Sequence, residues 1–243
     1  MGIWAAVKYA LNSTLGTSSF LSLDKMIQAH GTQTFTEDGT FTVPDGVHKI
    51  LITAAAGGQA GNIGRKFGNS SEVLCGGLGG NGGDCILKKT FNVTPRQKIS
   101  ITVGKGGAKA GEIGTATVIG SLVTLAGGNN TNNGSNNGGG TGGKGGVFWS
   151  GDGDILLPVP GQDGLLGSGG GISTVGTNEG SFNAYGGGGG GSIGNGGNGG
   201  VSGVLAENVG MNGTMGGGGG GAHIEGYSAT VGKGGDGIVI IEW

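Results

Sequence analysis

The sequence predicts a mainly β fold that carries a bundle of polyglycine II helices, preceded by a short N-terminal helical segment. Three observations lead to this fold class. Of the 243 residues 67 are Gly, while only 12% are charged and 5% are aromatic, so large apolar side chains cannot build the whole core. Blocks rich in β-branched residues flank the glycine tracts, as is typical of strands. Several tracts also repeat every three residues, which is the period of a polyproline-II-type helix.

The first 30 residues differ from the rest because Gly is nearly absent from them. Their apolar residues recur at three- and four-residue steps, at Ile3, Trp4, Val7, Leu11 and Leu15. This spacing favours a short amphipathic helix, and the apolar stretch Phe20–Ile27 favours a second turn. A short helix is marginal without a partner for its apolar face. Residues 1–30 are therefore predicted to be an attachment or oligomerisation segment; the alternative is that they fold back onto their own domain.

Residues 31–126 predict a β framework, which the segment 237–243 closes. The blocks with strand composition are 32–36, 40–43, 49–55, 86–93, 98–103, 115–119 and 122–125. Lys98–Val103 alternates apolar and polar residues, so one face should be buried. Gly120 and Ser121 predict a hairpin turn. The closing strand is expected to pair back into the same sheet, so that residues 127–236 form a large glycine-rich insertion.

The glycine tracts carry a three-residue rhythm, with Gly-Gly-X repeated three times over residues 76–84. Gly in two of every three positions lets neighbouring backbones approach closely and exchange hydrogen bonds, so stacked polyglycine helices joined by loops are predicted. Collagen is unlike this chain, which has only 4 Pro and an interrupted repeat. The alternative is a set of flexible loops.

The composition argues against several classes of function. The net charge is −2 and basic residues are scattered, so no nucleic-acid partner is predicted. No stretch approaches the roughly 20 apolar residues of a membrane helix. The three His residues are dispersed, and Cys75 and Cys85 match no metal motif, so no metal, cofactor or enzymatic activity is predicted. The two cysteines could form a disulfide or stay as thiols.

Three sequence blocks resemble phage glycine-rich tail-fibre domains. The first is Phe41–Gly58, with Phe-Thr-Val-Pro-Asp-Gly at its start; the second is Phe91–Gly107; the third is the closing Gly234–Trp243. Together they cover about residues 32–243. The polyglycine tracts are also similar to those of the long-tail-fibre tip adhesins of T-even-like phages, and the opening Lys8–Thr17 looks like N-termini of fibre or baseplate-associated proteins.

The resemblance implies a virion tail-fibre tip protein, an adhesin that binds a bacterial surface receptor, either a polysaccharide or a protein. It implies attachment to another fibre or baseplate protein through residues 1–30, a possible homotrimer, and assembly in the host cytoplasm. Met1–Tyr9 lacks the apolar core of a signal peptide, so release by lysis is expected.

Receptor contacts are expected where other residues interrupt the glycine tracts, because binding residues concentrate on loops. The segments are 129–137, 147–166, 181–185 and 223–227. Rare aromatic and polar side chains there are suited to sugars and protein surfaces. The predicted receptor-binding residues are Phe148, Trp149, Asp152, Phe182, Tyr185, His223 and Tyr227. Alternatively, the aromatic side chains only pack the loop bases. Two rival functions are a purely structural fibre or capsid component and an ice-binding protein.

Overall fold

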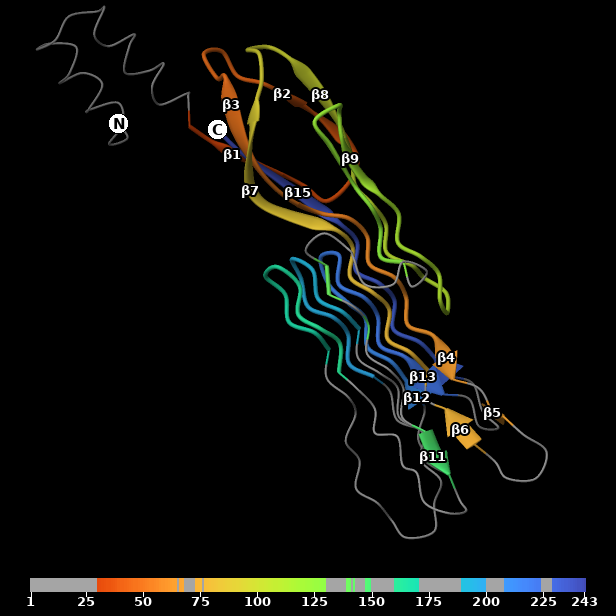
Figure 1. The fold of residues 1–243 in the computed structure, drawn as a ribbon. Helices are drawn as coiled ribbons and strands as arrows, with labels where there is room; N and C mark the ends of the chain where they lie inside the picture. The colour runs from red at the N-terminus through yellow and green to blue at the C-terminus, as the bar shows by residue number, and fades with distance from the viewer. Residues whose placement is uncertain are drawn as a thin grey trace, which may run out of the picture.

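The computed structural model describes residues 30–64, 66–67, 73–75, 77–129, 139–140, 142, 147–149, 160–170, 189–199, 208–223 and 229–243. This part of the chain is an elongated all-β molecule (Figure 1). Two four-stranded sheets form one end, and closely packed glycine-rich segments form the rest. His30 is the first described residue. It lies, like the C-terminus, at the end of the molecule that the two sheets form (Figure 1).

The first sheet, sheet A, has the strand order β1-β15-β3-β7 and is antiparallel throughout. Its strands are β1 (Thr32–Phe35), β15 (Ile238–Glu242), β3 (Lys49–Ala55) and β7 (Cys85–Asn92). The closing strand thus pairs with both the first and the third strand, which confirms the expectation that it returns to the framework. β7 has a bulge opposite Ile52–Ala54, and Lys88 has a positive φ of 44° there.

The second sheet, sheet B, has the order β10-β9-β8-β2 and is also antiparallel. Its strands are β10 (Val123–Leu125), β9 (Thr117–Ile119), β8 (Lys98–Thr102) and β2 (Gly39–Thr42). The hairpin predicted at Gly120 joins β9 to β10. The predicted alternation of β8 is confirmed, because Ile99 and Ile101 are buried while their neighbours in the strand are exposed.

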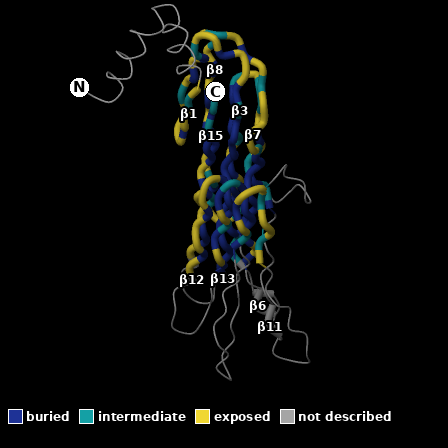
Figure 2. The backbone as a smooth tube through the Cα atoms, turned by 90° about the vertical axis from the view of Figure 1, so that its left-hand side faces the viewer, coloured by how far each residue is buried: buried dark blue, intermediate teal, exposed yellow. Residues whose placement is uncertain are grey.

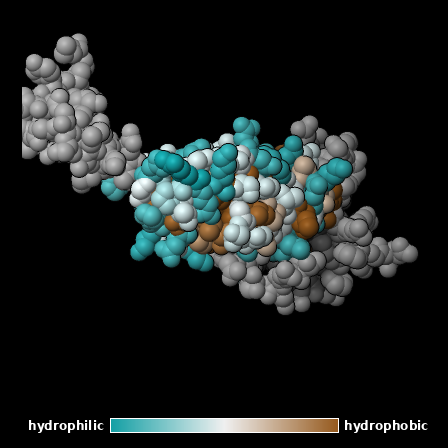
Figure 3. All heavy atoms as spheres, turned by 90° about the horizontal axis from the view of Figure 1, so that it is seen from above, coloured by the Kyte–Doolittle hydropathy of each residue, from teal (hydrophilic) through white to brown (hydrophobic). Residues whose placement is uncertain are grey.

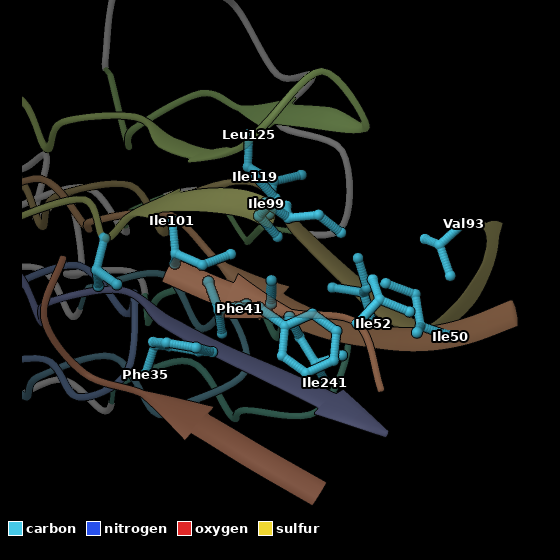
Figure 4. Close-up of a cluster of buried hydrophobic side chains, with 14 of the residues drawn as sticks. Phe35, Phe41, Ile50, Ile52, Val93, Ile99, Ile101, Ile119, Leu125 and Ile241 are labelled. Atoms are coloured by element: carbon cyan, nitrogen blue, oxygen red, sulfur yellow. The ribbon is translucent and has the colours of Figure 1, made fainter. Parts of the chain in front are cut away.

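The apolar core lies between these two sheets (Figure 4). Sheet A contributes Phe35, Ile50, Ile52, Val239 and Ile241, and sheet B contributes Phe41, Ile99, Ile101, Ile119 and Leu125. Each fully buried side chain of this size contributes about 1.5–3 kcal/mol relative to an exposed one. The core is therefore confined to the end of the molecule where β-branched and aromatic residues are dense in the sequence.

The predicted fold class, mainly β with a polyglycine II helix bundle and a short N-terminal helical segment, is wrong. The structure is all β, and the described residues contain no helix. The N–H groups of the glycine-rich segments bond mostly to carbonyls of distant segments, as from Gly58 to Gly235 and from Gly80 to Gly219, and not to the carbonyl four residues earlier as in an α-helix. The helix expected in the N-terminal segment falls on residues 1–29, which lie outside the described residues.

The glycine-rich segments pack side by side below the two sheets, and we call them the glycine slab (Figure 1). Residues 57–62 show how the slab is bonded. Gly57 and Ala60 donate to segment 112–115, Gly58 and Gly61 to segment 232–235, and Gln59 and Asn62 to segment 78–81. The slab comprises residues 56–62, 77–84, 104–116, 126–129, 139–140, 142, 160–170, 189–199, 210–221 and 231–237. Within residues 57–62, every third N–H therefore bonds to the same neighbouring segment, which matches the three-residue spacing in the sequence.

Backbones in the slab interior lie too close together for side chains. A Cβ atom added to Gly219 would lie 1.9 Å from the carbonyl oxygen of Gly232, and one added to Gly61 would lie 2.0 Å from that of Gly220. Figure 2 shows the slab interior as buried. Hydrogen bonds between backbones therefore take the place of an apolar core in this part of the molecule.

Thr117 links the slab to the sheets. Its side chain is fully buried, and Oγ1 donates to the Ala55 carbonyl at 2.9 Å while accepting from the Gly104 amide at 2.9 Å. These two bonds satisfy one donor and one acceptor of the backbone where β3 and β8 leave the sheets. A buried polar group left without a partner is destabilising by about 1–3 kcal/mol.

Thr117→Val is expected to lower the free energy of unfolding by about 2–4 kcal/mol, because valine keeps the shape but leaves the Gly104 amide and the Ala55 carbonyl without these bonds. Urea-induced unfolding followed by circular dichroism measures the change. Thr124→Val on the exposed side of β10 is the matched control and should change the free energy by less than about 0.5 kcal/mol. Equal effects of the two substitutions would contradict this role of Thr117.

Candidate functional site: the end of the slab farthest from the termini

Seven short strands lie at the end of the slab farthest from His30 and the C-terminus (Figure 1). They are β4 (Ile63–Gly64), β5 (Lys66–Phe67), β6 (Val73–Cys75), β11 (Val147–Trp149), β12 (Asn208–Val209), β13 (Ala222–His223) and β14 (Ala229–Thr230). We call this region the distal end. Each strand is only two or three residues long.

Two of the segments predicted to bind a receptor meet partner strands at the distal end. β11 pairs antiparallel with β6, so that Phe148 lies opposite Leu74 and Trp149 lies opposite Val73. β5 completes this three-stranded sheet. β13 pairs in parallel with β4, which places His223 opposite Gly64, and β13 also contacts β12 and β14.

The structure therefore places the backbones of Phe148, Trp149 and His223 at one end of the molecule. The other predicted receptor-binding residues, Asp152, Phe182, Tyr185 and Tyr227, lie outside the described residues. Segment 150–159 follows directly on β11, and segment 224–228 joins β13 to β14. Both segments therefore start from strands of the distal end.

Sequence reasoning did not single out β5, β6 or β12 as parts of this end. β6 and β11 are about 70 residues apart in the chain, and both are too short to show a strand period. The only local signal was composition, because each interrupts the glycine tracts with larger residues such as Phe67 and Leu74.

Polar side chains on the slab surface mostly bond to the backbone of a neighbouring segment. Asn195 Oδ1 accepts from the Ser168 amide at 2.9 Å, and Asn212 Oδ1 accepts from the Lys233 amide at 2.8 Å. Glu112 accepts from the amides of Ala108 and Lys109, and these bonds lower the pKa of its carboxyl group. The two asparagines thus join neighbouring segments, whereas Glu112 stabilises a turn within its own segment.

The visible surface is mainly hydrophilic with separate apolar patches (Figure 3). The slab and its short terminal strands expose several large apolar side chains, namely Leu78, Ile113, Leu165, Leu166, Val209, Met211 and Met215. Val209 belongs to β12 at the distal end, and Met211 follows it by two residues, with 47% and 60% of their surfaces exposed. Singly exposed apolar residues of this kind are normal on a protein surface.

The described residues show no group of His, Cys, Asp or Glu that could hold a metal ion. Cys85 is buried beside Ser192, and burial raises the pKa of its thiol. In the described part of the chain, no helix has the length and apolar character required to cross a bilayer.

The family model described as "Glycine-rich domain" matches residues 33–243, and the chain belongs to this family. The match begins within β1 and ends at the last residue, so it covers both sheets and the slab. No curated protein matches the chain.

Proposed function

We propose that this member of the Glycine-rich domain family is the tip adhesin of a phage tail fibre. In this proposal the distal end binds a receptor on the bacterial surface, either a glycan or a protein, and the opposite end faces the particle. The function is binding alone, without a chemical reaction. The contacts come from segments 150–159 and 224–228 together with the neighbouring short strands.

One observation carries the proposal. The chain enters the described structure at His30 and ends at Trp243 at one end, while β11 and β13 lie at the other (Figure 1). A protein attached through its N-terminal segment would thus present the predicted binding residues away from the attachment point. Binding residues concentrate on loops positioned by a rigid scaffold.

The bonding of the slab supports the same proposal. Its segments are held by backbone groups, as in the bonds from Gly61 to Gly232 and from Gly219 to Gln59. These bonds are made by residues outside segments 150–159 and 224–228, and the proposal expects the sequence of those two segments to change with the receptor. Support by rigid elements also keeps the binding residues in a defined geometry.

The same slab supports one rival, a purely structural spacer in a fibre or capsid. The two functions differ in what they require of the distal segments. A spacer requires only the slab and the sheets, whereas an adhesin requires the chemistry of residues 150–159 and 224–228.

The test is adsorption of particles that carry the chain with residues 150–159 replaced by a Gly/Ser segment of equal length. This replacement leaves β11 and the slab segment 160–170 in place. The proposal predicts that adsorption to host cells falls about tenfold or more, as expected for losing at least about 1.4 kcal/mol of binding free energy. A second replacement covers residues 224–228 in the same way.

The matched control is Arg96→Ala, which removes an exposed ion pair with Asp45, 2.6 Å between Nε and Oδ1, near the opposite end. This change should leave adsorption within about twofold, since exposed pairs contribute at most about 1 kcal/mol to stability. If both distal replacements adsorb like the parent particle, the spacer function is correct and the adhesin proposal is wrong.

A further inference from the structure

Five segments of the glycine slab follow one another across one of its faces, in the order 166–170, 194–198, 210–214, 231–236 and 104–108. Each is joined to the next by a backbone hydrogen bond; these bonds run from Gly196 to Ser168, from Met211 to Asn198, from Gly213 to Lys233 and from Gly234 to Gly107. We call this row of five segments the capped face.

A side-chain oxygen crosses each of the four boundaries in this row and accepts a hydrogen bond from an amide of the next segment. The four bonds are Ser168 N–H to Asn195 Oδ1 at 2.9 Å, Asn195 N–H to Thr214 Oγ1 at 3.0 Å, Lys233 N–H to Asn212 Oδ1 at 2.8 Å, and Gly106 N–H to Asp236 Oδ1 at 2.8 Å. All four bonds lie at exposed positions.

In the slab interior, an amide of this kind is bonded to a backbone carbonyl instead. The bond from Gly61 to Gly232 is 2.9 Å long and that from Gly80 to Gly219 is 2.8 Å long, so the side-chain bonds match them in length. Amide, hydroxyl and carboxylate oxygens are all suitable acceptors. On the capped face, the side-chain oxygens therefore take the place that a carbonyl of one more segment would occupy.

The same arrangement recurs in the two segments at the ends of the row. Asp163 Oδ1 accepts from the Gly169 amide at 2.8 Å, and Thr115 Oγ1 accepts from the Lys105 amide at 2.6 Å. Both bonds are exposed. Capping by side-chain oxygens is thus a repeated feature of the outer segments.

Amides left open on such a face would attract another backbone. Open rows of N–H and C=O groups at sheet edges recruit further chains, and proteins protect those edges. Glycine segments need this protection more, because their backbones pack closely enough that a Cβ atom on Gly219 would lie 1.9 Å from the Gly232 oxygen. A second copy of the chain carries the same segments at the same spacing, so it is the partner that an open face fits.

We propose that the side-chain oxygens of the capped face keep the slabs of two copies apart. Each oxygen occupies an amide that a second backbone would otherwise bind, and its side chain holds that backbone beyond hydrogen-bonding distance. Without these oxygens, the face binds the same face of a second copy. The inference concerns this face alone and does not depend on receptor binding or on contacts through residues 1–30.

The experiment compares two variants of the full-length protein. The open variant, Asn195→Ala with Asn212→Ala, frees the amides of Ser168 and Lys233 without changing the charge. The matched control, Ser168→Ala with Met211→Ala, changes two exposed side chains of the same face that make none of the four bonds. Sedimentation equilibrium measures the mass of each from micromolar to millimolar concentration.

The open variant is expected to rise with concentration to about twice the mass of the parent, as for a twofold dimer. The control should keep the mass of the parent throughout. Amide exchange then locates the contact. In the dilute open variant, the amides of Ser168 and Lys233 should exchange about tenfold or more faster than in the parent, because their acceptors are gone. At high concentration their protection should return, while the Gly219 amide stays protected at all concentrations because the slab remains folded.

A mass equal to that of the parent at every concentration would overturn the proposal. Equal association of the control would do the same. So would association that leaves the amides of Ser168 and Lys233 unprotected, because the contact would then lie elsewhere. If the open variant loses protection at Gly219, Asn195→Ala and Asn212→Ala are measured singly. Each removes one bond and must still raise the mass at millimolar concentration for the proposal to stand.

Discussion

Replacing Gly219 with alanine is expected to lower the free energy of unfolding by about 4 kcal/mol or more, enough to unfold a marginally stable domain. The added Cβ would lie 1.9 Å from the Gly232 oxygen and 2.3 Å from its carbonyl carbon. The Gly219 segment therefore has to move away from its neighbours. That movement breaks buried bonds such as those from Gly219 to Gln59 and from Gly80 to Gly219.

Urea-induced unfolding of Gly219→Ala, followed by circular dichroism, measures this change. Gly46→Ala is the control: Gly46 has φ +81° and no atom within 4 Å of the added Cβ. The free energy of unfolding of this variant should fall by only about 1–2 kcal/mol, the cost of placing a residue with a Cβ atom at a positive φ. If the two variants are equally stable, close backbone packing does not hold the slab together.

Phe41→Ala is expected to lower the free energy of unfolding by about 3–5 kcal/mol, as is usual for emptying a buried aromatic site. Phe41 is 1% exposed, lies on β2 in the centre of the core, and contacts the ring of Trp243. The cavity would separate sheet B from the closing strand of sheet A. The large loss is expected because this core is the only extensive apolar cluster in the described residues.

The same denaturation experiment tests this substitution, with Phe91→Ala as the matched control. Phe91 lies on the edge strand β7 and is only partly buried against the core, so its loss should be less than half as large. A smaller loss at Phe41 than at Phe91 would contradict the position assigned to the core.

The strands of the two sheets could be predicted from sequence because each carries a local signal. Alternation marks β8, β-branched residues mark β3, and Gly120 marks the turn between β9 and β10. The return of β15 into sheet A could be predicted from its composition and from the need to pair an apolar strand. Its exact neighbours, β1 and β3, could not, since register depends on contacts between residues about 180 to 210 apart in the sequence.

The glycine tracts could not be interpreted correctly from their repeat. The three-residue period predicts polyglycine II helices, yet the described residues contain no helix. The repeat instead reflects three neighbouring segments around residues 57–62, each receiving every third N–H. A glycine sequence shows that backbones approach closely, but it does not identify which distant carbonyl each N–H will reach.

The candidate site shows the same limit. Composition drew attention to Phe148, Trp149 and His223 because large residues are rare beside glycine. The pairing of β11 with β6 and of β13 with β4 gives their segments a common location, and no local pattern indicates either pairing. The roles of Asp152, Phe182, Tyr185 and Tyr227 stay predictions, as these residues lie outside the described part of the chain.

Amide hydrogen exchange tests the central claim most directly, namely that backbone hydrogen bonds make the glycine slab a rigid scaffold. The interior amides of Gly58, Gly61, Gly80 and Gly219 each donate to a carbonyl of another segment. They should exchange within about tenfold of the rate of the β3 amides, because both then require cooperative opening. Exchange of these glycine amides at the rate of an unstructured chain, while β3 stays protected, would contradict the account.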